Sequence, residues 1–450
     1  MMENLLKLSL VSLCLTFIPA KSMAKQWTLK DCITYALQNN ISLQKARLQQ
    51  QSAIEDIKQS QAQLLPSLNL GTSQNVSYNP WPEKGSYMIA GSKVQTSVDK
   101  VYYNGSYSLS SNWTVWNGNQ NRNQIKLNKL AAQQATLDSA QTANNILEQI
   151  AQYYVQILYS QEAVKVARQT FETSKKNEER GQEFLQQKLM SKADVAQLTA
   201  QRAQDEYSIV QAESNLRDYK RRLKQLLQIT NEEEFDIAVP TTTDEMALEA
   251  IPSMPSVYEA ALNSRPEIAN AELGIQSSDL SIKMAKALKL PTVALNAGLS
   301  TNTTSMNDKA WGTQIKNNFN MGAGVSVSIP LIDQRMAKTN INKAIIEKER
   351  YRLDLKDKQT ELYSTIENYW LQAINNQNMF KSAKSSTESA QSSYELLSEQ
   401  FRLGLKNIVE LMAGKDNLLR AQQNELQAKY LAILNIDMLK FYQNGSAALK

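Results

Sequence analysis

The sequence predicts a mainly α-helical protein with a small β part, and three observations support this. The chain has 14 glycines and 10 prolines in 450 residues. This is less than half of the share in an average protein, which indicates few turns and long elements. Two long stretches, 117–189 and 333–405, contain no proline. Four shorter segments alternate apolar and small polar residues with a period of two, which is the pattern of half-buried strands.

The chain contains an internal repeat. Residues 35–48 resemble residues 260–273 at an offset of 225 positions, and residues 194–195 resemble residues 410–411 at an offset of 216 positions. Matches that keep the same order in both halves predict two tandem units of one plan. Each unit is predicted to contain a helix, two strands, a very long helix, a turn and a further helix. We expect a first repeat over 25–235, a linker over 236–255, and a second repeat with a C-terminal tail over 256–450.

The first 24 residues have the composition of a secretory signal. Lys7 precedes an apolar run that ends at Ala20, and Ser22 and Ala24 supply the small residues of a cleavage site. The apolar run is too short for a membrane-spanning helix. Cleavage after Ala24 leaves Cys32 as the one remaining cysteine, so no intrachain disulfide is expected. We interpret Cys32 as a small buried hydrophobe.

The four predicted strands have one apolar and one polar face. The polar face consists of small residues with almost no charge, as in the water-filled interior of a membrane barrel with an apolar outer band. Trp81, Trp113, Trp116 and Trp311 lie in or beside these strands, as in the aromatic girdles of a bilayer interface. A face of a soluble sandwich is the alternative. The predicted apolar face consists of Leu68, Leu70, Thr72, Gln74, Val76, Tyr78, Tyr107, Leu109, Ser111, Trp113, Val115, Val293, Leu295, Ala297, Leu299, Met321, Ala323, Val325, Val327, Ile329 and Leu331.

Four strands are too few to close a transmembrane barrel, which needs about eight. An open sheet edge is not tolerated in lipid, so a membrane location requires several chains to share one barrel. Two copies would supply eight strands and three copies would supply twelve.

The second long helix has a coiled-coil seam, because apolar residues alternate between spacings of four and three. A single helix of this length is unstable in water and needs partners. Its polar side is either the surface of a solvated rod or a wall that lines water. The seam consists of Leu362, Ile366, Tyr369, Ala373, Asn376, Phe380, Ala383, Thr387, Ala390, Tyr394, Leu397 and Phe401.

The composition excludes most enzyme classes and gives no sign of a cofactor or a metal. The chain has no histidine, which removes Ser-His-Asp and Cys-His nucleophile pairs and all histidine-ligated metal sites. The net charge is +5, from 49 basic and 44 acidic residues. Spread over a chain of this length, this charge does not mark a nucleic-acid binder.

The arrangement resembles the outer-membrane efflux protein family, which is also called TolC-like. The resemblance covers residues 25–445 and is most specific at 402–411, Arg-Leu-Gly-Leu-Lys-Asn-Ile-Val-Glu-Leu. This matches the family's hairpin turn, which has the pattern Arg-x-Gly-x-x-x-x-x-Asp-Val. The first half keeps the acid at Asp194 but has Lys188 where the family usually has glycine.

This resemblance implies a homotrimer in the outer membrane, with one shared twelve-stranded barrel on a helical tunnel that reaches into the periplasm. It implies a passive exit channel that conducts small molecules or secreted polypeptides and catalyses nothing. Its partners would be a periplasmic adaptor protein, an inner-membrane pump and outer-membrane lipid. A soluble periplasmic coiled-coil adaptor or scaffold is the alternative.

The resemblance also assigns the candidate site residues. The adaptor would dock at the two turns, through Lys188, Leu189, Arg402, Leu403, Gly404 and Leu405. The alternative is a turn without a partner. Asp194 and Glu410 would form the pore constriction, where three copies of Glu410 make a ring of carboxylates that favours cations. The alternative is that these acids stabilise the N-termini of their helices.

Overall fold

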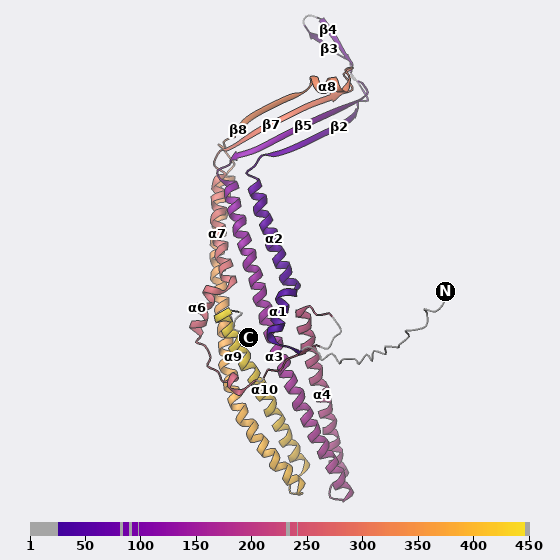
Figure 1. Ribbon diagram of the computed structural model, residues 1–450, viewed down its shortest axis with the longest axis vertical. Helices are drawn as coiled ribbons and strands as arrows, with labels where there is room; N and C mark the ends of the chain where they lie inside the picture. The colour runs from indigo at the N-terminus through magenta and orange to yellow at the C-terminus, as the bar shows by residue number, and fades with distance from the viewer. Residues whose placement is uncertain are drawn as a thin grey trace, which may run out of the picture.

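The protein is an elongated molecule with a β-sheet at one end and two helical hairpins at the other (Figure 1). The computed structural model describes residues 26–81, 84–89, 92–97, 99–230, 235–240 and 242–445. The expected signal sequence lies outside these residues.

The sheet joins the two halves of the chain. Its strands are β2 (Ser67–Tyr78), β5 (Val101–Trp116), β7 (Thr292–Thr304) and β8 (Asn320–Ser328), in the order β2-β5-β7-β8. All three pairings are antiparallel. The central pair, β5 with β7, connects a strand of the first half to a strand of the second half. The hydrogen-bonding edges of β2 and β8 have no partner strand among the described residues.

The register places the predicted faces on opposite sides of the sheet. Leu109 stands opposite both Leu70 and Leu299, whereas Ser108 stands opposite Gly71 and Ser300. The apolar face and the polar face of the sheet therefore each run across neighbouring strands, because side chains alternate between the two sides of a strand.

Two details of the predicted apolar face are wrong. The register shifts between Thr114 and Trp116, so Val115 falls in a β-bulge and Trp116 takes the place opposite Val293. Strand β8 ends at Ser328, before Ile329 and Leu331. Pro330 lies in this segment and has no backbone N–H to donate to a strand ladder.

The connections between paired strands contain elements that the sequence pattern did not predict. A hairpin of β3 (Lys84–Ile89) and β4 (Ser92–Ser97) lies between β2 and β5. A helix of seven residues, α8 (Trp311–Asn317), lies between β7 and β8.

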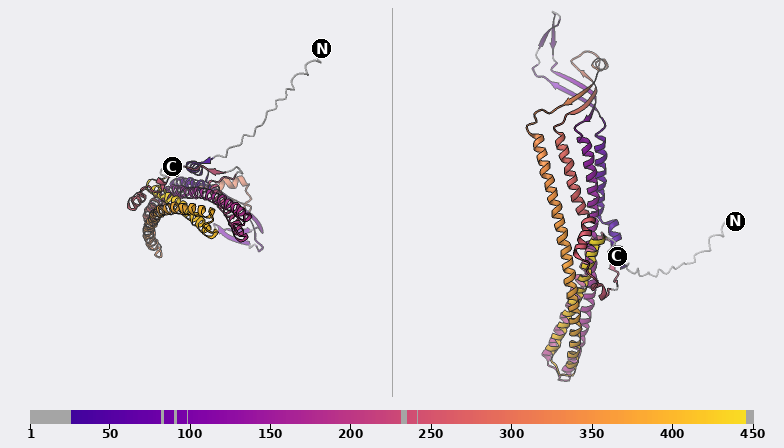
Figure 2. Two further views of the ribbon diagram at one scale, coloured as in Figure 1. Left: turned by 90° about the horizontal axis from the view of Figure 1, so that it is seen from below. Right: turned by 90° about the vertical axis from the view of Figure 1, so that its left-hand side faces the viewer.

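Below the sheet, four helices stand side by side in one curved layer (Figure 2). They are α2 (Ile41–Ala62), α3 (Gln120–Gln186), α7 (Pro266–Ala287) and α9 (Met336–Arg402), in the order α2-α3-α7-α9. Helices α3 and α9 have 67 residues each, which corresponds to a length of about 100 Å. Both begin after a residue in the left-handed region, Asn119 and Arg335, which are 216 positions apart.

Each long helix turns back into a second helix and forms a coiled-coil hairpin. Helix α3 pairs with α4 (Lys192–Leu227), and α9 pairs with α10 (Ile408–Asn444). The predicted seam of α9 is largely buried, whereas the polar seam residues Asn376 and Thr387 donate hydrogen bonds to carbonyls of their own helix. The buried seam residues are Leu362, Ile366, Ala373, Phe380, Ala390, Tyr394 and Phe401.

The two helical hairpins have the same leucine–glycine contact, with the two residue types exchanged between the helices. In the first hairpin, a Cβ atom added to Gly181 would lie 2.4 Å from Cδ1 of Leu198, and in the second, a Cβ atom added to Gly414 would lie 2.6 Å from Cδ1 of Leu397. The offset of 216 relates Gly181 to Leu397 and Leu198 to Gly414. In both hairpins, therefore, one leucine packs over one glycine at the same helix crossing. The glycine lies on the first helix of the first hairpin and on the second helix of the second hairpin.

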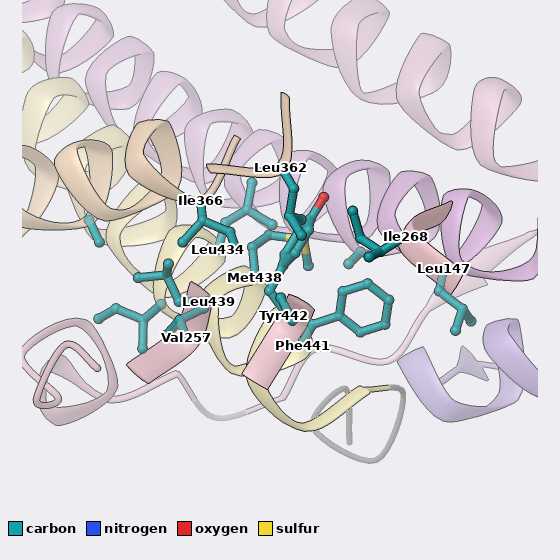
Figure 3. Packing of buried hydrophobic residues seen from close by; sticks show 14 residues of the cluster. Leu147, Val257, Ile268, Leu362, Ile366, Leu434, Met438, Leu439, Phe441 and Tyr442 are labelled. Atoms are coloured by element: carbon teal, nitrogen blue, oxygen red, sulfur yellow. The ribbon is translucent and has the colours of Figure 1, made fainter. Parts of the chain in front are cut away.

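The main hydrophobic core lies where the four-helix layer meets the hairpins (Figure 3). Helix α6 (Met254–Ser264) and the C-terminal part of α10 pack against α3, α7 and α9 there. Arg265, between α6 and α7, is buried beside this core and pairs with Glu148 and Glu267 at 2.8 and 3.1 Å. Its guanidinium also stacks on the ring of Tyr442 at 3.9 Å. A second core contains α1 (Leu29–Asn39) and the strand pair of β1 (Gln26–Trp27) with β6 (Asp236–Ile237).

Candidate functional site

The two hairpin tips have the same backbone structure. At the first tip, Leu189 N–H donates to the carbonyl of Phe184 and Lys188 N–H donates to that of Leu185, at 2.8 and 3.0 Å. At the second tip, Leu405 donates to Gln400 and Gly404 to Phe401, at 2.9 and 3.0 Å. Both patterns are Schellman motifs, in which the residue after the helix cap takes a left-handed conformation.

Lys188 occupies this left-handed position although it is not glycine. Its φ is 59°, close to the φ of 71° at Gly404. A side chain in this region costs about 1 kcal/mol or more. The departure from the family pattern at Lys188 therefore leaves the shape of the turn unchanged and places strain in the first tip.

Replacing Lys188 with glycine should stabilise the first tip. We expect a gain of about 1 kcal/mol from Lys188→Gly, which corresponds to roughly fivefold slower amide exchange in the tip peptide. Hydrogen exchange read by mass spectrometry measures this directly. Lys188→Ala is the matched control, because it removes the same charge but keeps a side chain at positive φ. Equal exchange rates in the two variants would show that the side chain of Lys188 does not strain the turn.

Apolar side chains project from the tips. Leu189 and Leu405 are both 71% exposed, and Leu403 is exposed beside Leu405. Arg402 is held against Glu399 on the same helix. The structure thus places Lys188 and Leu189 at one tip, and Arg402, Leu403, Gly404 and Leu405 at the other. Exposed leucines at a fixed turn are available for contact with another molecule.

The two candidate constriction acids have an identical structural role. Asp194 and Glu410 each complete a capping box, with Ser191 and Asn407 as the N-cap residues. Glu410 also pairs with Lys406 at 2.5 Å. The hydrogen bond from Lys406, followed by that from the backbone of Asn407, holds the pKa of Glu410 below its usual range. The acids therefore stabilise helix N-termini, and one of them carries its own positive partner.

A buried ionic cluster ties the two hairpins together. Lys415 of α10 pairs with Asp205 of α4, and its Nζ also donates to Ser174 Oγ of α3 at 2.7 Å. Lys415 and Asp205 are only 5% and 4% exposed. Nearby, Asn177 donates to the hydroxyl of Tyr394 at 3.4 Å. These contacts fix the second hairpin against the first at a short distance from the tips.

Sequence reasoning missed this cluster, although a signal was present. Lys415 follows Leu411 by four residues and precedes Leu418 by three, and Asp205 follows Leu198 by seven. Both charged residues therefore stand at seam positions of their coiled coils, where burial is expected and a charge requires a partner.

The open edges of the sheet and of the helix layer lie on the same two sides of the molecule. Strand β2 and helix α2 form one side, and strand β8 and helix α9 form the other (Figure 1). Each edge helix has a pair of exposed apolar residues seven positions apart, Ile41 with Leu48 on α2 and Ile346 with Leu353 on α9. The chain thus presents two unlike edges that continue from the sheet into the helices.

Comparison with known proteins identifies the family. The model of the outer membrane efflux protein family matches residues 32–228 and 257–439, one segment in each half of the chain. The chain belongs to the outer membrane efflux protein family. This protein is accordingly an outer-membrane efflux channel, and the family favours this function over a soluble adaptor or scaffold.

Named relatives agree with this family at low identity. "Probable outer membrane lipoprotein SilC" of Salmonella typhimurium is 23% identical over 414 residues, covering 89% of this chain and 82% of the relative. "Outer membrane protein TolC" of Vibrio cholerae is 22% identical over 421 residues, covering 92% of this chain and 89% of the relative.

Solved structures share the fold. The crystal structure of CusC matches with a TM-score of 0.76 at 16% identity, over 93% of this chain and 92% of that one. The Campylobacter jejuni CmeC outer membrane channel matches with a TM-score of 0.74 at 16% identity, over 93% of this chain and 86% of that one.

Two features are absent from the described residues. None of the helices in this part of the chain is long and apolar enough to cross a membrane. Nor do these residues contain a group of three or more cysteine, aspartate or glutamate side chains that could hold a metal ion.

Proposed function

We propose that three copies of this channel close head to tail into a twelve-stranded barrel on a helical tunnel. The observation that supports this is the coincidence of the open edges. Pairing β2 of one copy with β8 of the next satisfies the backbone groups that neither edge can satisfy alone. The same rotation brings α2 of one copy against α9 of the next, so that these two pairs of exposed apolar residues become buried.

The polarity of the sheet sets the orientation of this barrel. The polar face, with residues such as Asn69, Ser108 and Ser300, lines the interior, and the apolar face contacts lipid. Small uncharged side chains leave a wide aqueous path without a binding site for cargo. The channel is proposed to conduct small molecules or secreted polypeptides passively, with no catalytic step, and the energy comes from an inner-membrane pump through a periplasmic adaptor.

Cross-linking tests the proposed closure. Asn69 on β2 and Gly322 on β8 lie three strand spacings apart within one chain, about 14 Å. A bifunctional maleimide shorter than this distance can join a cysteine on the polar face of β2 (Asn69, Ser73 or Ser77) to a cysteine on the polar face of β8 (Gly322 or Ser326) only between copies. Several pairs are tested because barrel closure staggers neighbouring strands along their axes. Burial raises the pKa of the Cys32 thiol to about 12, so the native cysteine does not compete. We expect covalent products that end at three chains. Products that end at two chains, continue beyond three, or never form would refute the trimer.

The second tip is proposed to contribute both charges of the ion pair to the pore constriction. Because Lys406 neutralises Glu410 in each copy, Glu410→Gln should leave three uncompensated lysines and shift single-channel selectivity toward anions. Lys406→Gln is the matched control and should shift selectivity toward cations. Because the pKa of Glu410 is below its usual range, this carboxylate stays charged from neutral pH down to mildly acidic pH. We therefore expect constant wild-type selectivity from about pH 5 to about pH 8. Unchanged selectivity in both variants would place the pair away from the pore.

A further inference from the structure

Helix α8 lies over one face of the sheet, at the end remote from the long helices (Figure 1). Thr301 Oγ1 donates to the carbonyl of Ile315 in α8 at 2.8 Å. The indole of Trp311 donates to the hydroxyl of Tyr107 at 3.3 Å, and the two rings meet edge to face. Thr301 and Tyr107 stand opposite each other and share their face with Leu299 and Leu109, two residues further along each strand.

The apolar face changes its chemistry where α8 begins. Leu299 of β7 is followed on this face by Thr301 and Thr303, and Leu70 of β2 is followed by Thr72 and Gln74. The apolar band of the sheet is therefore interrupted under α8, and on the edge strand β2 the same face becomes apolar again at Val76, opposite Tyr103 of β5. A short helix over a polar part of the outer surface covers side chains that lipid tails could not solvate.

The turn that carries α8 is fixed by one buried amide. Gln314 is 4% exposed, and its Nε2 donates to the carbonyls of Thr304, Asn307 and Lys309 at 3.1, 3.0 and 2.7 Å. Its Oε1 accepts from the N–H of Thr304 at 2.8 Å. These bonds hold α8 in one place on the strands, so the residues on its outer side have a defined depth relative to the apolar band.

The exposed surface of α8 and of the turn before it combines apolar and charged groups. Trp311 is 55% exposed, and Met306, in the preceding turn, is also exposed. Lys309 and Lys316 are exposed and form no ion pair within the described residues, and Asp308, next to Lys309, is exposed as well. Tryptophan favours the boundary between lipid tails and headgroups, and lysine favours anionic headgroups.

We propose that α8 and the turn before it lie in the headgroup layer of the outer leaflet, with Trp311 at the boundary to the lipid tails. The inference rests on the proposed function, because it requires the strands to be inserted in the membrane with the apolar face outward. Helix α8 contacts the two central strands, β5 and β7, and is therefore remote from the edges where a neighbouring copy would pair. Lipid remains as the occupant of this surface, in continuity with the apolar band below it.

Depth-dependent fluorescence quenching tests this placement. The full-length protein is reconstituted into vesicles whose lipids carry bromine either close to the headgroup or deep in the tails. The difference in tryptophan fluorescence between the wild-type protein and Trp311→Phe gives the contribution of Trp311 to the emission. Trp113→Phe gives the corresponding signal from the other end of the apolar band, where the indole of Trp113 donates to the carbonyl of Leu64 at 2.8 Å.

We expect the Trp311 contribution to be reduced more by shallow than by deep bromine, and to be protected from aqueous iodide on both sides of the vesicle. If lipid quenches Trp113 while iodide alone quenches Trp311, the placement of α8 is wrong and the membrane barrel stands. If brominated lipid quenches neither residue, the proposed insertion of the sheet fails, and the inference fails with it.

Discussion

Leu405→Glu should abolish export while the channel still assembles and reaches the outer membrane. Leu405 projects from the second tip, about 100 Å from the sheet along α9, so its side chain takes no part in folding the strands. If the adaptor buries this leucine, the substituted carboxylate loses its water without gaining a partner, at a cost of several kcal/mol. The measurement is export by cells that carry each variant, with the amount of channel in the outer membrane determined in parallel.

Two matched variants isolate the cause. Leu405→Met keeps an apolar side chain of similar volume and should retain export. At the neighbouring position, Gly404→Asp should lose export, whereas Gly404→Asn has the same shape, tolerates positive φ and carries no charge. Full export in Leu405→Glu, at normal abundance of the channel, would remove this tip from the docking surface.

Lys415→Met should destabilise the hairpins by about 3–5 kcal/mol, because the buried carboxylate of Asp205 loses its charged partner. Ser174 would remain as a donor to Asp205, at 2.5 Å, but a hydroxyl does not compensate a buried charge. Denaturant unfolding of the solubilised channel, followed by its helical circular dichroism, measures the loss. The double variant Lys415→Met with Asp205→Leu should recover most of it, since replacing both partners with apolar residues removes the unpaired charge.

Lys440→Met is the control for a lost lysine. Lys440 pairs with Glu249 at 2.6 Å and approaches Asp437 at 4.0 Å, and the two carboxylate side chains are 50% and 40% exposed. This variant should therefore cost less than about 1 kcal/mol. Equal effects of the two single variants, or a double variant no more stable than Lys415→Met, would show that the buried pair does not hold the hairpins together.

The long elements could be predicted from the sequence because their signals are local. The stretches without proline became helices α3 and α9, and the seam of α9 is buried largely as its spacing indicates. The alternation of Leu68 and Leu70 with Asn69 and Gly71 predicts a strand with these pairs on opposite faces, and strand β2 has this arrangement. Periodicity reports which side of an element is buried, whatever its partner is.

Three local features could not be predicted from residue periodicity. Lys188 adopts the conformation of Gly404 because the hydrogen bonds of the Schellman motif and the following capping box outweigh the strain of one side chain. Val115 left the alternation because a bulge adds one residue to β5. Helix α8 has too few residues for a periodic signal, and its position depends on Gln314 and on strand residues that it covers.

The sequence by itself determined the two repeats, the lengths of the helices, the faces of the strands and the positions of the tip turns. The helix lengths and the strand faces follow from residue spacing within a few turns or a few strand positions. The repeats follow from ordered matches between the two halves, and the tip turns from the resemblance to the family's turn pattern. Only the tertiary structure decided that Lys415 meets Asp205, that β5 pairs with β7, and that the open edges of sheet and helices coincide. Lys415 and Asp205 are 210 residues apart, and their contact depends on how one repeat packs against the other. Spacing within either repeat carries no information about that packing.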